Sequence, residues 1–166
     1  MNTGEDLRVP KIAVNVSVEL HNREVWEGRL FLTTISERHH GPEQVMDLLQ
    51  QRELYLPIQL KDGPFRMIQK ATIVRLKVDR KLGLAELDPA GILETASILH
   101  RVKIRLVTGE DLLGDFPIWP DQSRDMRLLD WINAQPGFLP LLQPDAVVYI
   151  AHASVAWLEE EETKSV

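Results

Sequence analysis

The sequence predicts a mainly β protein with minor α content, in which two tandem copies of one small β unit each carry a short inserted helix. Two observations predict this class. Apolar and polar residues alternate with a period of two over segments that return on themselves, as in antiparallel hairpins. In addition, residues 47–58 and 130–141 share one order of residue types: Asp, two large apolar residues, an amide, a polar step, an aromatic residue, Leu-Pro and an aliphatic residue. Such ordered self-similarity is typical of a duplicated unit.

The first copy begins with a predicted hairpin. Residues 12–20 are expected to form a long strand, because strong strand formers alternate there with mostly polar residues. Residues 21–24 supply the turn, and residues 25–32 return as the second strand. Gly28 inside that strand indicates a bend, a bulge or a close approach of another backbone segment. The strand formers that define the first buried face are Ile12, Val14, Val16, Val18 and Leu20.

A short helix and further strands complete the first copy. Apolar residues at helical spacing predict an amphipathic helix over residues 43–52, and Pro42 suits its first turn. Residues 54–60 then form a strand in which Pro57 implies a sheet edge or a bulge, because proline has no N–H to donate. The copy is expected to end with two strands, or one bent strand, over residues 65–68 and 72–78.

Residues 79–101 form the joint between the copies. Residues 82–84 are expected to extend the preceding sheet, and a short helix is predicted from Asp88 to Leu99 with Pro89 in its first turn. This divides the chain into a first domain over residues 1–78 and a second over residues 79–166, which holds the linker helix, the second copy and an acidic tail. The tail is a run of like charges, which is typical of a solvated chain end.

The second copy aligns with the first without gaps inside its predicted elements. Its first hairpin, residues 102–118, matches at an offset of 86, its helix and following strand at 83, and its last segment at 82. Insertions therefore fall in loops or turns, as duplication of a folded unit requires. The sequence leaves open whether the two copies form separate barrels or one pseudo-symmetric pair that shares a sheet. The matched pairs include Val16 with Val102, Gly28 with Gly114, Asp47 with Asp130, Tyr55 with Phe138, Pro57 with Pro140 and Ile68 with Ile150.

Composition and charge exclude several classes of protein. The chain has 166 residues and no cysteine, which excludes disulfides, thiolate zinc sites and cysteine nucleophiles. No apolar run approaches the roughly 18 residues of a membrane span, and the first residues lack the pattern of a signal peptide, so a cytoplasmic location is expected. Residues 1–79 are neutral and residues 80–166 carry a net charge of -6. This acidic second half disfavours binding to a phosphate backbone.

The second copy contains an order of elements and two motifs that are typical of one family. A predicted helix is followed by a strand, an acidic turn containing Gly109 and a strand with an internal glycine at position 114. Residues 127–133 read Arg-Leu-Leu-Asp-Trp-Ile-Asn and residues 138–141 read Phe-Leu-Pro-Leu. In these features the second copy resembles the Sm-like proteins, and most closely the helix and strand motifs of their bacterial members. The resemblance implies two tandem Sm-like small β-barrel domains, each of five strands. For true Sm proteins it would also imply ring assembly and single-stranded RNA binding.

Residues with catalytic or metal-binding chemistry do not form a recognisable motif. Asp47 and Asp130 occupy matching helix positions, but a structural acid that bonds to the backbone or to a neighbouring cation explains them without catalysis. His39 and His40 are adjacent and lack a third ligand in any known spacing. There is no Gly-rich phosphate loop and no nucleophile elbow. We therefore expect no enzyme activity, no catalytic residues, no cofactor and no metal.

A protein–protein interaction or assembly module is the function that this reading favours, through self-association or another protein partner. Strand edges near Pro57 and Pro140 are expected to pair with partner strands. One alternative is a nucleic-acid-binding module for single-stranded RNA, because three cations alternate along one strand and share a face. A small-ligand sensor between the copies is the other. The candidate interaction residues are Trp26, Trp157, Arg101, Lys103 and Arg105.

Overall fold

The computed structural model describes residues 10–36, 38–93, 99–119 and 127–161. Its ten strands are all antiparallel to their neighbours and form one sheet in the order β10-β6-β7-β8-β9-β5-β1-β2-β3-β4. The predicted mainly β class is confirmed. The strands are β1 (Lys11–Leu20), β2 (Val25–Thr33), β3 (Tyr55–Leu60), β4 (Phe65–Gln69), β5 (Ile73–Asp79), β6 (Leu99–Leu106), β7 (Asp111–Pro117), β8 (Phe138–Leu142), β9 (Ala146–Ala151) and β10 (Val155–Glu160).

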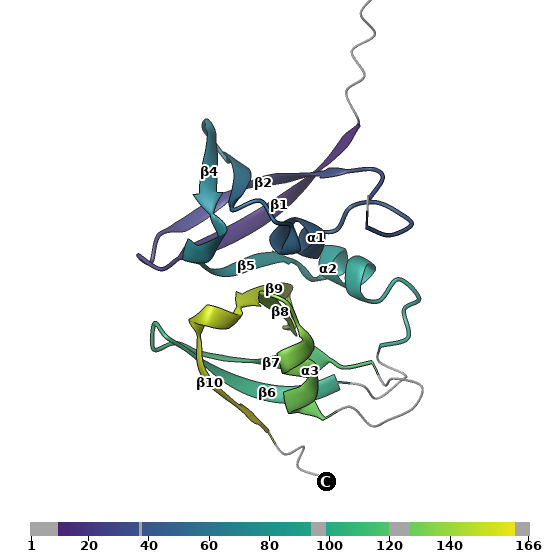
Figure 1. Cartoon of the computed structure of the whole chain (residues 1–166), viewed down its shortest axis with the longest axis vertical. Coiled ribbons are helices and arrows are strands. Elements are labelled where there is room, and N and C mark those ends of the chain that lie inside the picture. Colours follow the sequence, from purple (N-terminus) through teal and green to yellow (C-terminus); the bar gives the residue numbers. More distant parts are fainter. Residues whose placement is uncertain (1–9, 37, 94–98, 120–126, 162–166) are drawn as a thin grey trace, which may run out of the picture.

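The chain folds into two units of five strands each, the first from β1 to β5 and the second from β6 to β10. The first unit lies in the upper half of Figure 1 and the second in the lower half. Each unit has a hairpin, a short helix, a second hairpin, a 3-10 turn and a last strand that returns beside the first. The helices α1 (Val45–Gln50) and α3 (Leu128–Ala134) occupy matching places, as do the 3-10 turns Lys70–Thr72 and His152–Ser154.

The two units share one sheet because β5 of the first pairs with β9 of the second. This answers the question that the sequence left open between separate barrels and a shared sheet. The sheet is not closed, and the two Sm-like barrels that the resemblance implies are not confirmed. Each unit contributes five strands to a continuous, bent ten-stranded sheet (Figure 1).

Buried apolar residues form two clusters that follow the units only in part. The first cluster holds the inward side chains of β1 to β5, and it also includes residues of β8 and β9. The second cluster lies under β6 and β7, where Trp131 packs on Phe116 with a ring separation of 4.9 Å. Because the first cluster runs across the joint, the units are held by packing as well as by backbone pairing. The second-unit residues in the first cluster are Phe138, Leu142, Val147, Tyr149 and Ala151.

The joint contains a helix earlier than the sequence predicted. Residues 82–84 do not extend the sheet, because α2 (Arg80–Leu87) begins directly after β5. The Asp79 side chain accepts a hydrogen bond from the backbone N–H of Lys81 at 3.1 Å, which caps the helix. The predicted helix from Asp88 to Leu99 is wrong in its described part: α2 ends at Leu87, and Asp88, the residue before Pro89, is not helical, because a following proline disfavours the helical conformation. Residues 94–98 lie outside the described residues.

The strands that contain Pro57 and Pro140 are not the edges of the sheet. β3 lies between β2 and β4, and β8 lies between β7 and β9. Proline is tolerated there because β3 pairs with β2 only through Gln59 and Leu60, which leaves Pro57 without a partner strand on that side. The edge strands are β4 and β10, toward opposite ends of the long axis (Figure 1).

Gly28 and Gly114 mark matching close approaches in the two units. A Cβ on Gly28 would lie 2.4 Å from the carbonyl oxygen of Gln59, and a Cβ on Gly114 would lie 2.6 Å from that of Leu142. These are the points where β3 meets β2 and β8 meets β7. The close backbone approach that Gly28 suggested is therefore present, and any larger residue would push the hairpins apart. None of the described helices is long and apolar enough to cross a membrane.

Candidate interaction surface

The joint between the units, where β5 pairs with β9, shows how one unit binds another. In it, Leu76 of β5 lies opposite Tyr149 of β9, and Lys77 lies opposite Val148. Beside the strands, Arg75 bridges Glu19 of its own unit at 2.6 Å and Glu110 of the second unit at 2.8 Å. The joint thus combines a strand pair with an ion-pair network.

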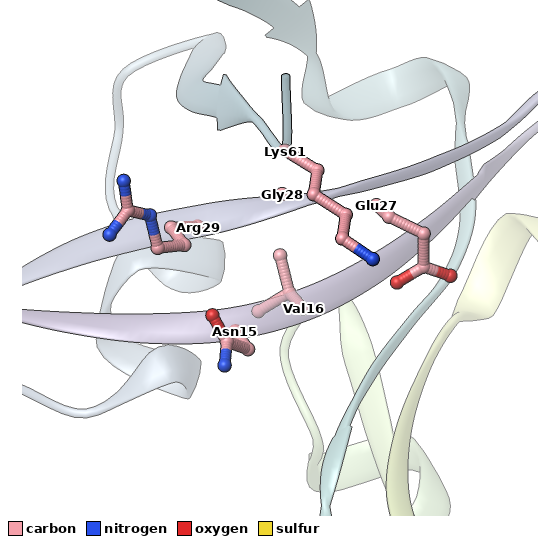
Figure 2. A pocket seen from close by; sticks show the side chains of 6 residues that line it. All are labelled: Asn15, Val16, Glu27, Gly28, Arg29 and Lys61. Carbon is pink, nitrogen blue, oxygen red and sulfur yellow. The ribbon is translucent and has the colours of Figure 1, made fainter. Parts of the chain in front are cut away.

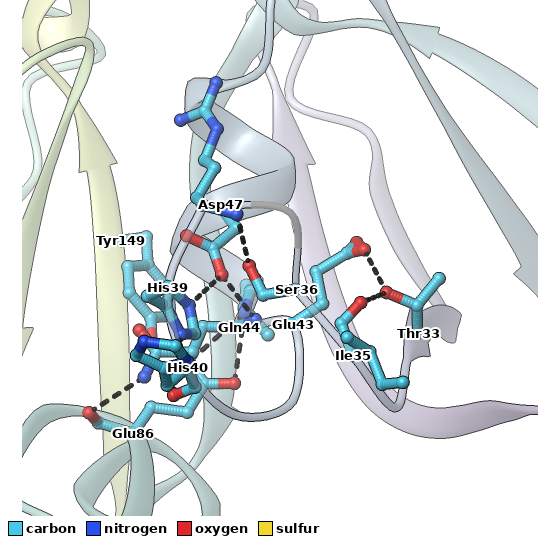
Figure 3. Close-up of polar contacts among 12 residues, drawn as sticks. Thr33, Ile35, Ser36, His39, His40, Glu43, Gln44, Asp47, Glu86 and Tyr149 are labelled. Carbon is cyan, nitrogen blue, oxygen red and sulfur yellow. Dashed lines mark hydrogen bonds and ion pairs between the residues drawn. The ribbon is translucent and has the colours of Figure 1, made fainter.

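A buried polar network fastens the helices of the first unit to β9. The Glu86 carboxylate accepts hydrogen bonds from the backbone N–H of Val45 at 3.0 Å and from the Tyr149 hydroxyl at 3.1 Å. Figure 3 shows Glu86 and Tyr149 near Gln44, the residue that precedes α1. Burial raises the pKa of Glu86 and also raises the pKa of Tyr149. Glu86 therefore links α1, α2 and the second unit through one carboxylate.

Asp47 acts as a structural acid in the same network. Its carboxylate accepts from the backbone N–H of Gln44 at 2.8 Å and contacts Nε2 of His39 at 2.7 Å. The hydrogen bond to Asp47 raises the pKa of His39. Asp130, at the matching position of α3, is exposed. Nothing pairs the two aspartates, and among the described residues no group of three or more His, Asp or Glu side chains is placed to hold a metal ion.

On the side of β4 that has no partner strand, the backbone N–H and C=O groups of alternate residues point outward. The N–H of Lys70 donates to the carbonyl of Leu54 at 2.8 Å, which extends the β3–β4 ladder. Because an antiparallel ladder alternates, the polar backbone groups of Arg66 and Ile68 then point at β3 and those of Met67 point away from it. Pro57 lies opposite Met67 and has no N–H to donate, in agreement with this pattern.

The open side of β10 follows the same rule. The N–H of Glu161 donates to the carbonyl of Arg101 at 2.9 Å. Alternation then directs the backbone groups of Glu159 at β6 and those of Leu158 and Glu160 away from it. The described part of the chain therefore ends its sheet in two strands, β4 and β10, each with free donors and acceptors along one side.

Trp157 and the basic residues predicted from the sequence lie together on β6 and β10. Trp157 is 41% exposed, and the Arg105 guanidinium carbon and the Lys103 Nζ lie 5.1 Å and 5.9 Å from the centroid of its ring. Each of these cations also faces an acid: Arg105 and Lys103 face Asp111, and Arg101 Nη1 lies 3.4 Å from Asp115. Pairing with Arg105 lowers the pKa of Asp111. This neutralisation leaves little net charge with which to attract a phosphate backbone.

Trp26, the candidate residue of the first unit, already has partners, and so do two cations of that unit. Trp26 donates from Nε1 to Glu24 at 3.0 Å, and the Arg66 guanidinium lies over its ring at 4.7 Å. Arg23 donates to the carbonyl of Thr108 in the second unit at 3.2 Å. Lys70 donates to the carbonyl of Gln51, and burial lowers its pKa.

His152 matches Lys70 in position, as the alignment at an offset of 82 indicates, and also in its contact, which the sequence did not predict. His152 Nε2 lies 2.7 Å from the carbonyl oxygen of Gln135, so this nitrogen carries the proton. Lys70 makes the corresponding bond at 3.2 Å to the carbonyl of Gln51. Each cation or imidazole therefore holds the carboxyl end of its unit's helix to the 3-10 turn. The replacement of one donor by another was visible in the alignment, but its acceptor was not.

Two shallow hollows bear on the small-ligand alternative. One, of about 410 Å³, opens over β1 and β2 and is lined by Asn15, Glu27, Arg29 and Lys61 (Figure 2). Arg29 there donates to Gln59 at 2.9 Å. The other, of about 310 Å³, lies between the units and contains the Arg75 ion pairs. Neither hollow is enclosed or apolar in the manner of ordinary ligand pockets.

Comparison with known proteins gives no relative: no family model matches the chain, and no curated protein or solved structure is significantly similar to it.

Proposed function

We propose that the protein is a non-enzymatic assembly module whose copies associate head to tail, with β10 of one chain pairing with β4 of the next. The observation that carries this proposal is the β5–β9 pair inside the chain. β10 occupies in the second unit the place of β5 in the first, and β4 occupies in the first unit the place of β9 in the second. The chain thus contains one strand pair between its units, and its two edge strands match the two strands of that pair.

The internal joint also gives the register. Transfer of the pair between Leu76 and Tyr149 by 82 residues places Leu158 opposite Met67. Both of these residues point their backbone groups to the open side, so they suit a hydrogen-bonded pair. The same transfer places Glu159 opposite Arg66, which brings opposite charges together across the strands.

Such a contact is heterologous, because two different surfaces meet. Repetition of a heterologous contact gives a closed ring or an open filament according to the rotation between neighbours. The five strands of each unit are the number that the resemblance to Sm-like proteins implies, and we propose membership of that family together with the assembly role. Backbone pairing, rather than a chemical reaction, is then the activity of the chain.

Replacement of Glu160 by proline tests the edge directly. Glu160→Pro removes an N–H on the open side of β10 and leaves the bonds to β6 in place. We expect self-association, measured by sedimentation equilibrium, to weaken roughly tenfold or more. Glu160→Ala is the matched control, because it also removes the 3.0 Å contact with His100 but keeps the N–H. Equal association of the two variants would contradict pairing at this edge.

A further inference from the structure

The outer face of the β3–β4 hairpin is exposed where the matching face of the second unit is buried. Tyr55, Phe65 and Met67 lie on one face of this hairpin and are 54%, 53% and 63% exposed. The corresponding residues of β8 and β9 are at most 5% exposed. These counterparts are Phe138, Val147 and Tyr149, all members of the first buried cluster.

Helices of the first unit cover the matching face of the second. α2 packs closely on β9, since a Cβ on Gly83 would lie 2.3 Å from Cγ2 of Val147. Val45 and Leu49 of α1 belong to the same buried cluster as Phe138 of β8. Glu86 then bonds both to α1 and to Tyr149. The β8–β9 face is therefore covered by α2 together with α1, and α3 is the helix of the second unit that matches α1.

Helix α3 matches α1 in position, but among the described residues it does not cover the face of a neighbouring unit's hairpin as α1 does. Leu129 is 66% exposed, whereas Met46 at the matching position of α1 is half-buried. Ile132 is half-buried and its counterpart Leu49 is buried. Trp131 alone reverses the trend, because it fills the core of its own unit against Phe116. Leu129 and the exposed part of Ile132, which otherwise packs against the second cluster, thus form an apolar strip on α3 that is open among the described residues.

We propose that α3 of one copy docks on the exposed β3–β4 face of the next, with Leu129 and Ile132 packing against Tyr55, Phe65 and Met67. This inference rests on the proposed function, because pairing of β10 with β4 brings the two surfaces together. The occupant of the apolar face is therefore a second copy of this chain. Backbone hydrogen bonds alone do not distinguish β4 from other exposed strands, whereas the contact of α3 with the β3–β4 face is specific to a second copy of this chain.

Cysteine crosslinking distinguishes this contact from the strand pair, since the chain has no cysteine of its own. The double variant Leu129→Cys with Tyr55→Cys, treated with a short bis-maleimide, is expected to give a ladder of covalent oligomers beyond the dimer. Each single variant can join only like to like and stops at the dimer. Glu159→Cys with Arg66→Cys reports the strand pair in the same assay. All four sites are solvent-exposed, so the variants should keep the fold.

Three outcomes separate the proposals. Ladders from both double variants support helix docking. A ladder from the strand pair alone overturns helix docking and leaves the proposed function standing, and the absence of both ladders overturns both. As an independent measurement, Leu129→Lys should weaken self-association roughly tenfold or more, whereas Leu129→Met should preserve it. Unchanged association of Leu129→Lys would also overturn helix docking.

Discussion

At the scale of single residues, the Glu86 carboxylate connects the two units through hydrogen bonds. It bonds to the first residue of α1 and to a fully buried tyrosine of the other unit. Sequence reasoning could not find it, because its partners lie 41 and 63 residues away in the chain. Asp47, in contrast, could be assigned a structural role beforehand, and its contacts with Gln44 and His39 agree with that role.

Substitution of Glu86 gives a prediction with a defined pH dependence. Glu86→Ala leaves the Val45 N–H and the Tyr149 hydroxyl unpaired and should lower the free energy of unfolding by about 2 kcal/mol. Glu86→Gln keeps an acceptor and should cost less. Because the pKa of Glu86 is raised in the folded protein, folding favours its protonated form. Its contribution is present below the ordinary pKa of a glutamate and is lost as pH rises through the folded-state pKa.

Urea unfolding of the wild type and Glu86→Gln across the acidic to neutral range measures this effect. The stability of the wild type relative to Glu86→Gln should rise as pH falls. A difference that stays constant with pH would show that burial does not perturb Glu86.

At the scale of secondary structure, most strands could be predicted from the alternation of apolar and polar residues and from turn residues. This alternation is a local property that indicates which face of a strand is buried. The long strand expected over residues 12–20 is β1, and the helix expected over residues 43–52 contains α1. The joint was mispredicted because its structure depends on distant contacts. Gly83 weakens a helix intrinsically, yet it lies in α2 because the helix must approach Val147.

Replacement of this glycine tests that explanation. Gly83→Ala raises helix propensity and would stabilise an isolated helix by roughly 1 kcal/mol. In the folded protein the added Cβ would lie within 2.5 Å of two side-chain atoms of Val147, so we expect a net loss of about 1–3 kcal/mol in the free energy of unfolding. Thermal unfolding measures it. Val147→Ala should relieve part of the loss when combined with Gly83→Ala, and a stabilised single variant would contradict close packing of α2 on β9.

At the scale of the whole molecule, the β5–β9 joint is the basis of the proposed function, because the edge strands β10 and β4 occupy the places that match β5 and β9. The sequence predicted two similar units but placed the edges at Pro57 and Pro140, since it could not show that both prolines face a stretch without a partner strand. The sequence placed Arg101, Lys103 and Arg105 on one face of a strand but did not predict that Trp157 of the edge strand β10 lies beside Lys103 and Arg105. The two acids that face Arg101, Lys103 and Arg105 could not be predicted from the sequence to offset most of the charge of these three cations.

The central claim is that free β4 and β10 edges of different copies pair. Light scattering at two protein concentrations, with and without a short single-stranded RNA, tests it most directly. We expect a mass above the 19.0 kDa of one chain that increases with concentration and does not depend on RNA. A mass of 19.0 kDa at both concentrations, shifting only when RNA is added, would contradict assembly and would favour the nucleic-acid-binding alternative.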